Sequence, residues 1–147
     1  MQKILIAEDD LMIADMAEEM LIEHGYNVCG IARTVAEAVA LARLHKPDLV
    51  VIDMRLADGG LGTQIAAQLK SLPHLGILYA SGNLSQIILT AANGHASLAK
   101  PYRGSDLLRG LEIVTDIVAT GRASAPFPRG FQVLPSAIAA PKELSHG

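Results

Sequence analysis

Residues 48–53 constrain the fold of this chain most strongly, because four consecutive apolar residues there end in an acid, Asp53. An unbroken apolar run of this length predicts a strand buried on both faces, as in a parallel sheet. Open α/β sheets place their ligand sites at the carboxyl ends of their strands. Asp53 is therefore a candidate functional residue, although a lone acid at this place could also be a helix cap or a turn residue.

Strand and helix patterns alternate along the first 120 residues. Short runs rich in apolar residues predict strands at 3–7, 26–32, 48–53, 75–80 and 96–99. Amphipathic spacing and capping residues predict helices at 11–23, from Thr34 to about Leu44, at 62–70, at 85–92, and from a Ser105 cap to about Thr120. This alternation predicts an α/β, doubly wound, flavodoxin-like fold with a five-stranded parallel sheet in the order 2-1-3-4-5.

Composition excludes several classes of protein. The chain has 147 residues, half of them apolar, and a net charge of −3, which predicts one folded domain and no nucleic-acid surface. No apolar stretch approaches the ~20 residues that span a bilayer, and the N-terminus lacks a signal-peptide pattern, so we expect a cytoplasmic protein without membrane contact. The single cysteine, Cys29, excludes an internal disulfide framework.

Residues 121–147 differ from the predicted domain of residues 1–120. They contain four of the seven prolines and both phenylalanines, Phe127 and Phe131, which are unusual in a flexible tail. We expect an ordered arm, packed on its own domain or on a neighbour, and no separate output domain. The helix at 105–120 has an apolar arc of about 220°, which is wider than one buried stripe requires. Its outer face should be covered by this arm, a partner or a second copy; a few exposed aliphatic residues are the alternative.

Polar side chains close the predicted strands. In the order 2-1-3-4-5 the first and third strands are neighbours, so Glu8, Asp9 and Asp53 should converge. Three adjacent carboxylates repel one another and favour a cation, and Mg²⁺ suits an incomplete set of oxygen ligands. Ser81 and Lys100 close two further strands and add a hydroxyl and a positive charge. Such a set can stabilise the charge of phosphoryl transfer.

These residues resemble the receiver domain of bacterial response regulators in two-component signalling, over residues 1–120. The resemblance rests on Glu8-Asp9, Asp53, Ser81 and the pair Lys100-Pro101, each of which follows a predicted strand in the family's order. It implies that Asp53 accepts a phosphoryl group from the phosphohistidine of a sensor histidine kinase, and that Lys100 and Ser81 bind phosphoryl oxygens.

The resemblance also implies a magnesium site. Asp9 and Asp53 would bind Mg²⁺ directly, together with the backbone carbonyl of Arg55, and Glu8 would act through water. Asp10 would cap the following helix instead of binding the ion.

Two features depart from the common family pattern. Ser97 stands where most members carry an aromatic residue, so the usual hydroxyl–aromatic switch is incomplete. Residues 78–82 (Leu-Tyr-Ala-Ser-Gly) are similar to the Phe-Ala-Thr-Gly signature of a subgroup dominated by single-domain receivers. In that subgroup a mobile loop and the fourth helix carry the switch, and we expect the same route here.

The sequence therefore favours a single-domain, phosphoprotein response regulator that signals by protein contact, with a homodimer as one option. It would be no enzyme beyond its own phosphorylation and dephosphorylation. A phosphorelay intermediate that passes phosphate to a histidine phosphotransfer protein is an alternative, as is a scaffold that works without phosphorylation. A phosphohydrolase with Asp53 as nucleophile is a third, but haloacid-dehalogenase-type enzymes need an acid where Arg55 stands.

Overall fold

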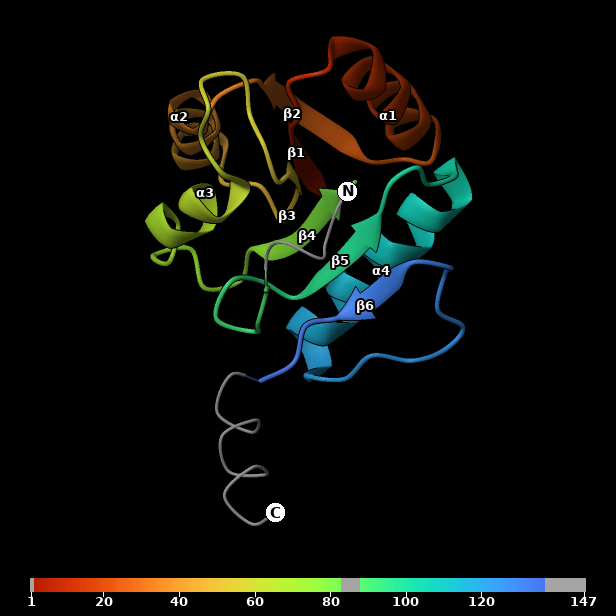
Figure 1. Cartoon of the computed structure of the whole chain (residues 1–147). Helices are drawn as coiled ribbons and strands as arrows, with labels where there is room; N and C mark the ends of the chain where they lie inside the picture. Colours follow the sequence, from red (N-terminus) through yellow and green to blue (C-terminus); the bar gives the residue numbers. More distant parts are fainter. Residues whose placement is uncertain (1, 83–87, 137–147) are drawn as a thin grey trace.

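The computed structural model of the protein describes residues 2–82 and 88–136. Within this part of the chain, strands and helices alternate as far as β4, β5 is the next described element, and a last strand follows α4 (Figure 1). The elements are β1 (Lys3–Ala7), α1 (Leu11–Glu23), β2 (Asn27–Ala32), α2 (Val35–His45), β3 (Leu49–Asp53), α3 (Gly62–Gln68), β4 (Gly76–Ser81), β5 (Ala96–Ala99), α4 (Gly104–Thr120) and β6 (Phe131–Val133).

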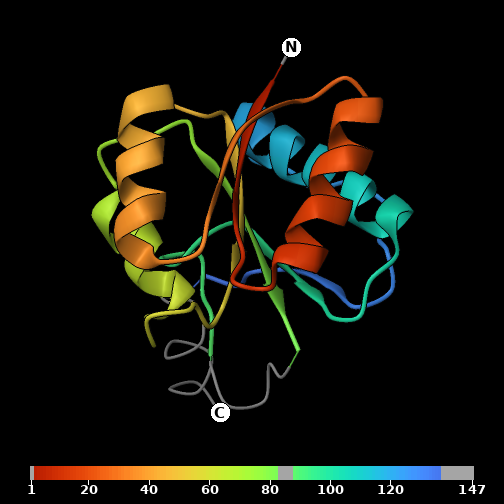
Figure 2. The ribbon, with the colours of Figure 1, turned by 90° about the horizontal axis from the view of Figure 1, so that it is seen from above.

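The strands form one sheet in the order β2-β1-β3-β4-β5-β6. The first five are parallel, as the sequence predicts, and β6 is antiparallel to β5. The predicted parallel sheet of five strands in the order 2-1-3-4-5 is confirmed, and the C-terminal extension adds a sixth, unpredicted strand at the β5 edge. Helices α2 and α3 cover one face of the sheet, and α1 and α4 cover the other (Figure 2).

Each face of the sheet has its own apolar core. Successive side chains of a strand point to opposite faces, so the unbroken apolar runs of β1 and β3 supply both cores. Leu5, Val50 and Ile52 pack toward α2 and α3. Ile4 and Val51 pack toward α1 and α4. This double burial holds the carboxyl ends of the central strands in fixed positions.

Local hydrogen bonds set the helix boundaries. The carboxylate of Asp10 accepts the N–H groups of Met12 and Ile13, at 3.0 and 3.3 Å, and so caps α1 as predicted. The prediction that Ser105 caps the last helix is wrong, because α4 already begins at Gly104. Its first turn is closed instead by the carboxylate of Asp106, which accepts the N–H of Arg103 at 3.3 Å.

The helix predicted at 85–92 is not present in the part that the structure describes. Residues 85–87 lie outside the described residues, and residues 88–92 lead into a turn. The Asn93 side chain accepts the N–H of Thr90 at 3.0 Å, and the Asn93 N–H donates to the Thr90 carbonyl at 2.8 Å. Asparagine bonds of this kind compete with helical hydrogen bonding, and here they prevail.

The C-terminal extension packs on its own domain over residues 122–136, as expected, and residues 137–147 lie outside the described part. Leu134 is buried in the core next to α2 and α3, and Phe131 packs against the core next to α4. Ile113 of α4, the helix predicted to have a covered outer face, is fully buried. No helix within residues 2–82 and 88–136 is long and apolar enough to cross a membrane.

Leu134→Ala should lower the free energy of unfolding by about 2 kcal/mol, near the low end for buried leucines, because Leu134 lies at the edge of the core. Gln132→Ala, on an exposed side chain of β6 two residues earlier, should change it by less than about 0.5 kcal/mol. Urea unfolding of both variants measures the difference. Equal effects would mean that the extension contributes no packing.

Candidate functional site

Three carboxylates meet at the carboxyl ends of β1 and β3. Ala7 of β1 lies beside Ile52 of β3, so the acids that follow these residues come together. One carboxylate oxygen from each of Glu8, Asp9 and Asp53 lies within 4.8 Å of the others. Glu8 is buried, and its N–H donates to the Ala32 carbonyl at 2.9 Å, which fixes the turn after β1. The convergence that the strand order predicts is confirmed.

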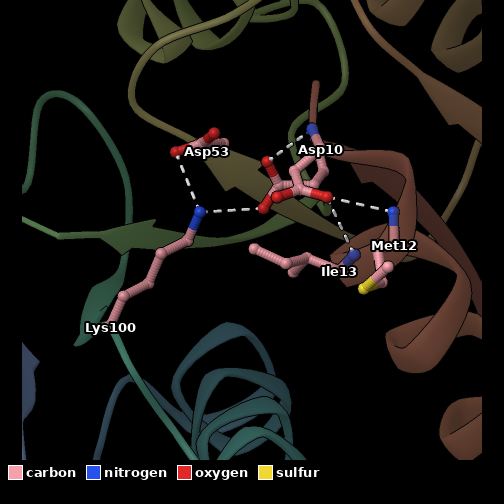
Figure 3. A network of polar contacts seen from close by, with 6 residues as sticks. Asp10, Met12, Ile13, Asp53 and Lys100 are labelled. Atoms are coloured by element: carbon pink, nitrogen blue, oxygen red, sulfur yellow. Dashed lines mark hydrogen bonds and ion pairs between the residues drawn. The ribbon is translucent and has the colours of Figure 1, made fainter.

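Lys100 crosses the site from the end of β5. Its Nζ lies 2.8 Å from Glu8 Oε1 and 3.3 Å from Asp53 Oδ1 (Figure 3). The Lys100 N–H also donates to the carbonyl of Ser81 at 2.8 Å. Ser81 is the buried last residue of β4. The backbone thus ties the two positions predicted to bind a phosphoryl group to each other.

The charges at this site perturb one another. Burial, the hydrogen bond with Glu8 and the negative charge of Glu8 raise the pKa of Asp53 to about 7, and Lys100 only partly opposes them. Burial alone would lower the pKa of Lys100, but its hydrogen bond to Glu8 and the charges of both acids raise it. One ammonium is therefore too little to keep Asp53 fully ionised at neutral pH.

The donor set fits a hard divalent cation. Three carboxylates offer oxygen atoms to one point, and a second positive charge there would oppose the burial and the Glu8 charge that raise the pKa of Asp53. Asp10 is engaged as the cap of α1 and is not part of this cluster. Arg55 pairs with Leu61 in an isolated bridge in the loop after β3. Its role as a carbonyl ligand stays a prediction.

Tyr102 belongs to the site, although the sequence arguments did not single it out. It is half-buried, and burial raises the pKa of its hydroxyl, with smaller effects from Lys100, Glu8 and Asp53. Together with Ile13 and Met20 it lines a groove of about 550 Å³ between α1 and the start of α4, and Lys100 lies at this groove. The sequence signal that could have identified Tyr102 is its position, two residues after Lys100.

An aromatic residue lies beside Ser97 on the neighbouring strand. Ser97 is buried and pairs with Tyr79 of β4, whose ring is also fully buried. The Tyr79 hydroxyl donates to the carbonyl of Asn93 at 2.7 Å. Tyr79 therefore anchors the turn that ends at Asn93. This turn lies in the segment between Ser81 and β5.

Metal-free protein should become less stable relative to Asp53→Asn as the pH rises from about 4 to 8. Folding raises the pKa of this acid from 3.8 to about 7, so between these pH values the folded state holds a proton that the unfolded state has released. Stability is therefore lost as the pH rises through this window, and the loss levels off above about pH 7. Urea unfolding in a chelator at several pH values measures the difference between the two proteins.

Asp15→Asn, on an exposed acid of α1, is the matched control and should show no such trend. Adding Mg²⁺ should shrink the difference for Asp53→Asn, because a bound cation favours the ionised carboxylate. A difference that stays constant with pH would contradict the raised pKa.

The chain resembles known proteins over most of its length. The model of the response regulator receiver domain family matches residues 4–112. The transcriptional regulatory protein PdtaR of Mycobacterium tuberculosis is 37% identical over 116 residues, which are 76% of this chain and 56% of the relative. The chemotaxis protein CheY of Bacillus subtilis is 26% identical over 112 residues, which cover 74% of this chain and 93% of CheY.

Solved structures agree with the family match. A CheY-like receiver domain protein from Methanospirillum hungatei superposes with a TM-score of 0.74 at 26% identity, over 83% of this chain and 99% of that one. The chain spans about half the length of PdtaR, so that protein's whole activity does not carry over. With the fold, the strand order and the family match in agreement, the chain belongs to the response regulator receiver domain family.

Proposed function

We propose that this chain is a cytoplasmic phospho-acceptor switch that takes a phosphoryl group from a sensor histidine kinase onto Asp53, depends on Mg²⁺, and signals by protein contact. One observation carries the proposal: Asp53 lies within 4.8 Å of the Glu8 and Asp9 oxygens and 3.3 Å from the Lys100 ammonium. A carboxylate among acids, with a single cation beside it, is suited to receive a phosphoryl group and to need a metal.

The reacting groups have distinct tasks. An oxygen of Asp53 attacks the phosphorus, a new P–O bond forms, and the P–N bond to the kinase histidine breaks as the imidazole leaves and takes a proton. Lys100 neutralises charge on the transferred group from its position beside Asp53. The Ser81 hydroxyl, at the end of the neighbouring strand, is assigned to a further phosphoryl oxygen.

Glu8 and Asp9 would hold the cation together with Asp53. When bound, Mg²⁺ supplies positive charge to the acids and to the phosphoryl oxygens. Asp53 attacks only when ionised, and in the metal-free site its pKa is about 7. The site therefore gives a physical reason for metal dependence: burial and the nearby Glu8 favour a proton on Asp53, and a divalent ion would favour its ionised form instead.

Incubation with acetyl phosphate and Mg²⁺ should add one phosphoryl mass to the wild-type chain in intact-mass spectra, and none to Asp53→Asn. Lys100→Ala should slow the gain on the order of 10²-fold, a typical loss when one charge-stabilising donor is removed. Lys70→Ala, on an exposed lysine that follows α3, should leave the rate unchanged. Phosphoryl mass on Asp53→Asn would refute the assignment of the acceptor.

Asp9→Ala and Asp10→Ala should separate metal binding from helix capping. Mg²⁺ at 100 times its dissociation constant should stabilise the wild type by about 2.7 kcal/mol, and Asp9→Ala should lose this gain. Asp10→Ala should keep the gain but lower stability by about 1 kcal/mol, because it removes only the cap of α1. Unfolding with and without Mg²⁺ measures both; the reverse pattern would mean that Asp10 is the ligand.

A further inference from the structure

The C-terminal extension closes an edge of the sheet that would otherwise be unpaired. Its strand β6 contributes three residue pairs to β5, from Ala96↔Val133 to Leu98↔Phe131. One further hydrogen bond lies at each end of this ladder. The Ala99 N–H donates to the Gly130 carbonyl at 3.0 Å, and the Leu134 N–H donates to the His95 carbonyl at 3.0 Å. β6 therefore pairs with β5 in the way that a short peptide from another protein could.

Two side chains of the extension pack on opposite faces of the sheet. The ring of Phe131 lies over Gly110 of α4 and beside Leu78 of β4; a Cβ at position 110 would lie 3.3 Å from this ring. Leu134 is buried on the other face, in the cluster that contains Tyr79 and Leu89. The β5 edge thus offers a binding site for an aromatic side chain and, three residues further along the bound segment, a site for an aliphatic side chain.

The segment before β6 is held by few interactions. The Arg109 guanidinium donates to the carbonyls of Ser124 at 2.7 Å and Pro126 at 3.0 Å. Phe127 stacks on Phe131 with ring centroids 6.0 Å apart, yet half of its surface is exposed. Short segments with few buried contacts and partly exposed polar ties open at low free-energy cost. Loss of these ties would leave the extension held by the short β6 ladder and by the side chains of Phe131 and Leu134.

The extension contacts two segments next to the phosphoryl site: the end of β5, just before Lys100, and the turn that follows β4. Ala99, which bonds Gly130, directly precedes Lys100. Gly130 has a φ of +76°, and a Cβ there would lie 3.0 Å from the Cβ of Ala99, so the two backbones are close. In the turn beyond β4, the Ala91 N–H donates to the Pro135 carbonyl at 2.8 Å. Six residues, 130–135, thus bridge the segments that follow Ser81 and precede Lys100.

We propose that the β5 edge and the adjoining face of α4 form a docking surface for an extended segment of a partner protein. In the unphosphorylated chain residues 122–136 occupy this surface, and phosphorylation of Asp53 loosens them. The inference rests on the proposed function for its trigger. The bound β6 shows which partner fits: a strand antiparallel to β5 that carries an aromatic residue and, three residues later, an aliphatic one.

The trigger follows from the geometry of Lys100. A phosphoryl group on Asp53 takes space between that residue and the Lys100 ammonium, now 3.3 Å from Asp53 Oδ1. Lys100 and Ser81 readjust to the new oxygens, and both are continuous with the segments that the extension bridges. The extension is bonded to one segment through Gly130 and Ala99 and to the other through Pro135 and Ala91, so a shift of one segment relative to the other strains the three ladder pairs between these bonds. Once freed, the unpaired β5 edge favours a new strand.

A labelled peptide with the sequence of residues 128–136 tests the surface directly. Its binding to the full chain is measured by fluorescence anisotropy with and without acetyl phosphate and Mg²⁺, while intact mass reports the phosphoryl group. Phosphorylation should tighten binding at least tenfold. The same peptide carrying Phe131→Ala is the matched control and should bind the phosphorylated chain much more weakly, because it lacks the ring that lies over Gly110.

Two chain variants test the surface without phosphorylation. Arg109→Gln removes the hydrogen bonds to the carbonyls of Ser124 and Pro126, and Phe131→Ala vacates the site of the aromatic ring. Each variant chain should bind the unmodified peptide in the absence of acetyl phosphate. Circular dichroism verifies that both variants are folded. If both are folded and neither binds the peptide, the docking surface is refuted.

The outcomes separate this inference from the proposed function. A chain that gains the phosphoryl mass but no affinity for the peptide would overturn the release of the extension and leave the phospho-acceptor role intact. A chain that gains no phosphoryl mass would overturn that role, and with it the trigger. A phosphorylated chain that dimerises in light scattering and excludes the peptide would assign the surface to a second copy and refute a foreign strand.

Discussion

The contact of the Lys100 ammonium with Glu8 and Asp53 is the interaction on which the rest of the site depends. It joins the ends of β5, β1 and β3 through distances of 2.8 and 3.3 Å, at a place where one of the acids is buried. Buried acids without a positive partner would lose their charge or push the strands apart. One lysine balances only part of the negative charge, and the remainder favours a divalent cation, which would also offset the negative charge of a phosphoryl group.

The sheet and the acid cluster could be predicted because each follows from a strong local pattern. Four apolar residues before Asp53 indicate a strand buried on both faces, and this burial is observed for β3. Parallel strands end at one edge of the sheet, so acids that close neighbouring strands must approach one another. Glu8, Asp9 and Asp53 do so. The order of the strands, which the family resemblance also implies, was sufficient to place them.

The features that were missed depend on tertiary contacts or on competing local bonds. β6 has three residues, too few for an alternating pattern, and its partner β5 lies about 30 residues earlier in the chain. The turn before Asn93 replaces a predicted helix because one side chain closes it. The bond of Lys100 to Glu8, and the placement of Tyr79 beside Ser97, depend on the packing of strands far apart in sequence. Periodicity carries no information about such pairs.

Chemical trapping of the acceptor tests the phospho-acceptor role most directly. Borohydride reduces an acyl phosphate on an aspartate to homoserine, so the modified residue can be located by peptide mass after treatment with acetyl phosphate and Mg²⁺. Homoserine at position 53, and at no other acid, is the predicted result. Homoserine at position 9, or none in a chain that carries the phosphoryl mass, would contradict the assignment of Asp53 as the acceptor.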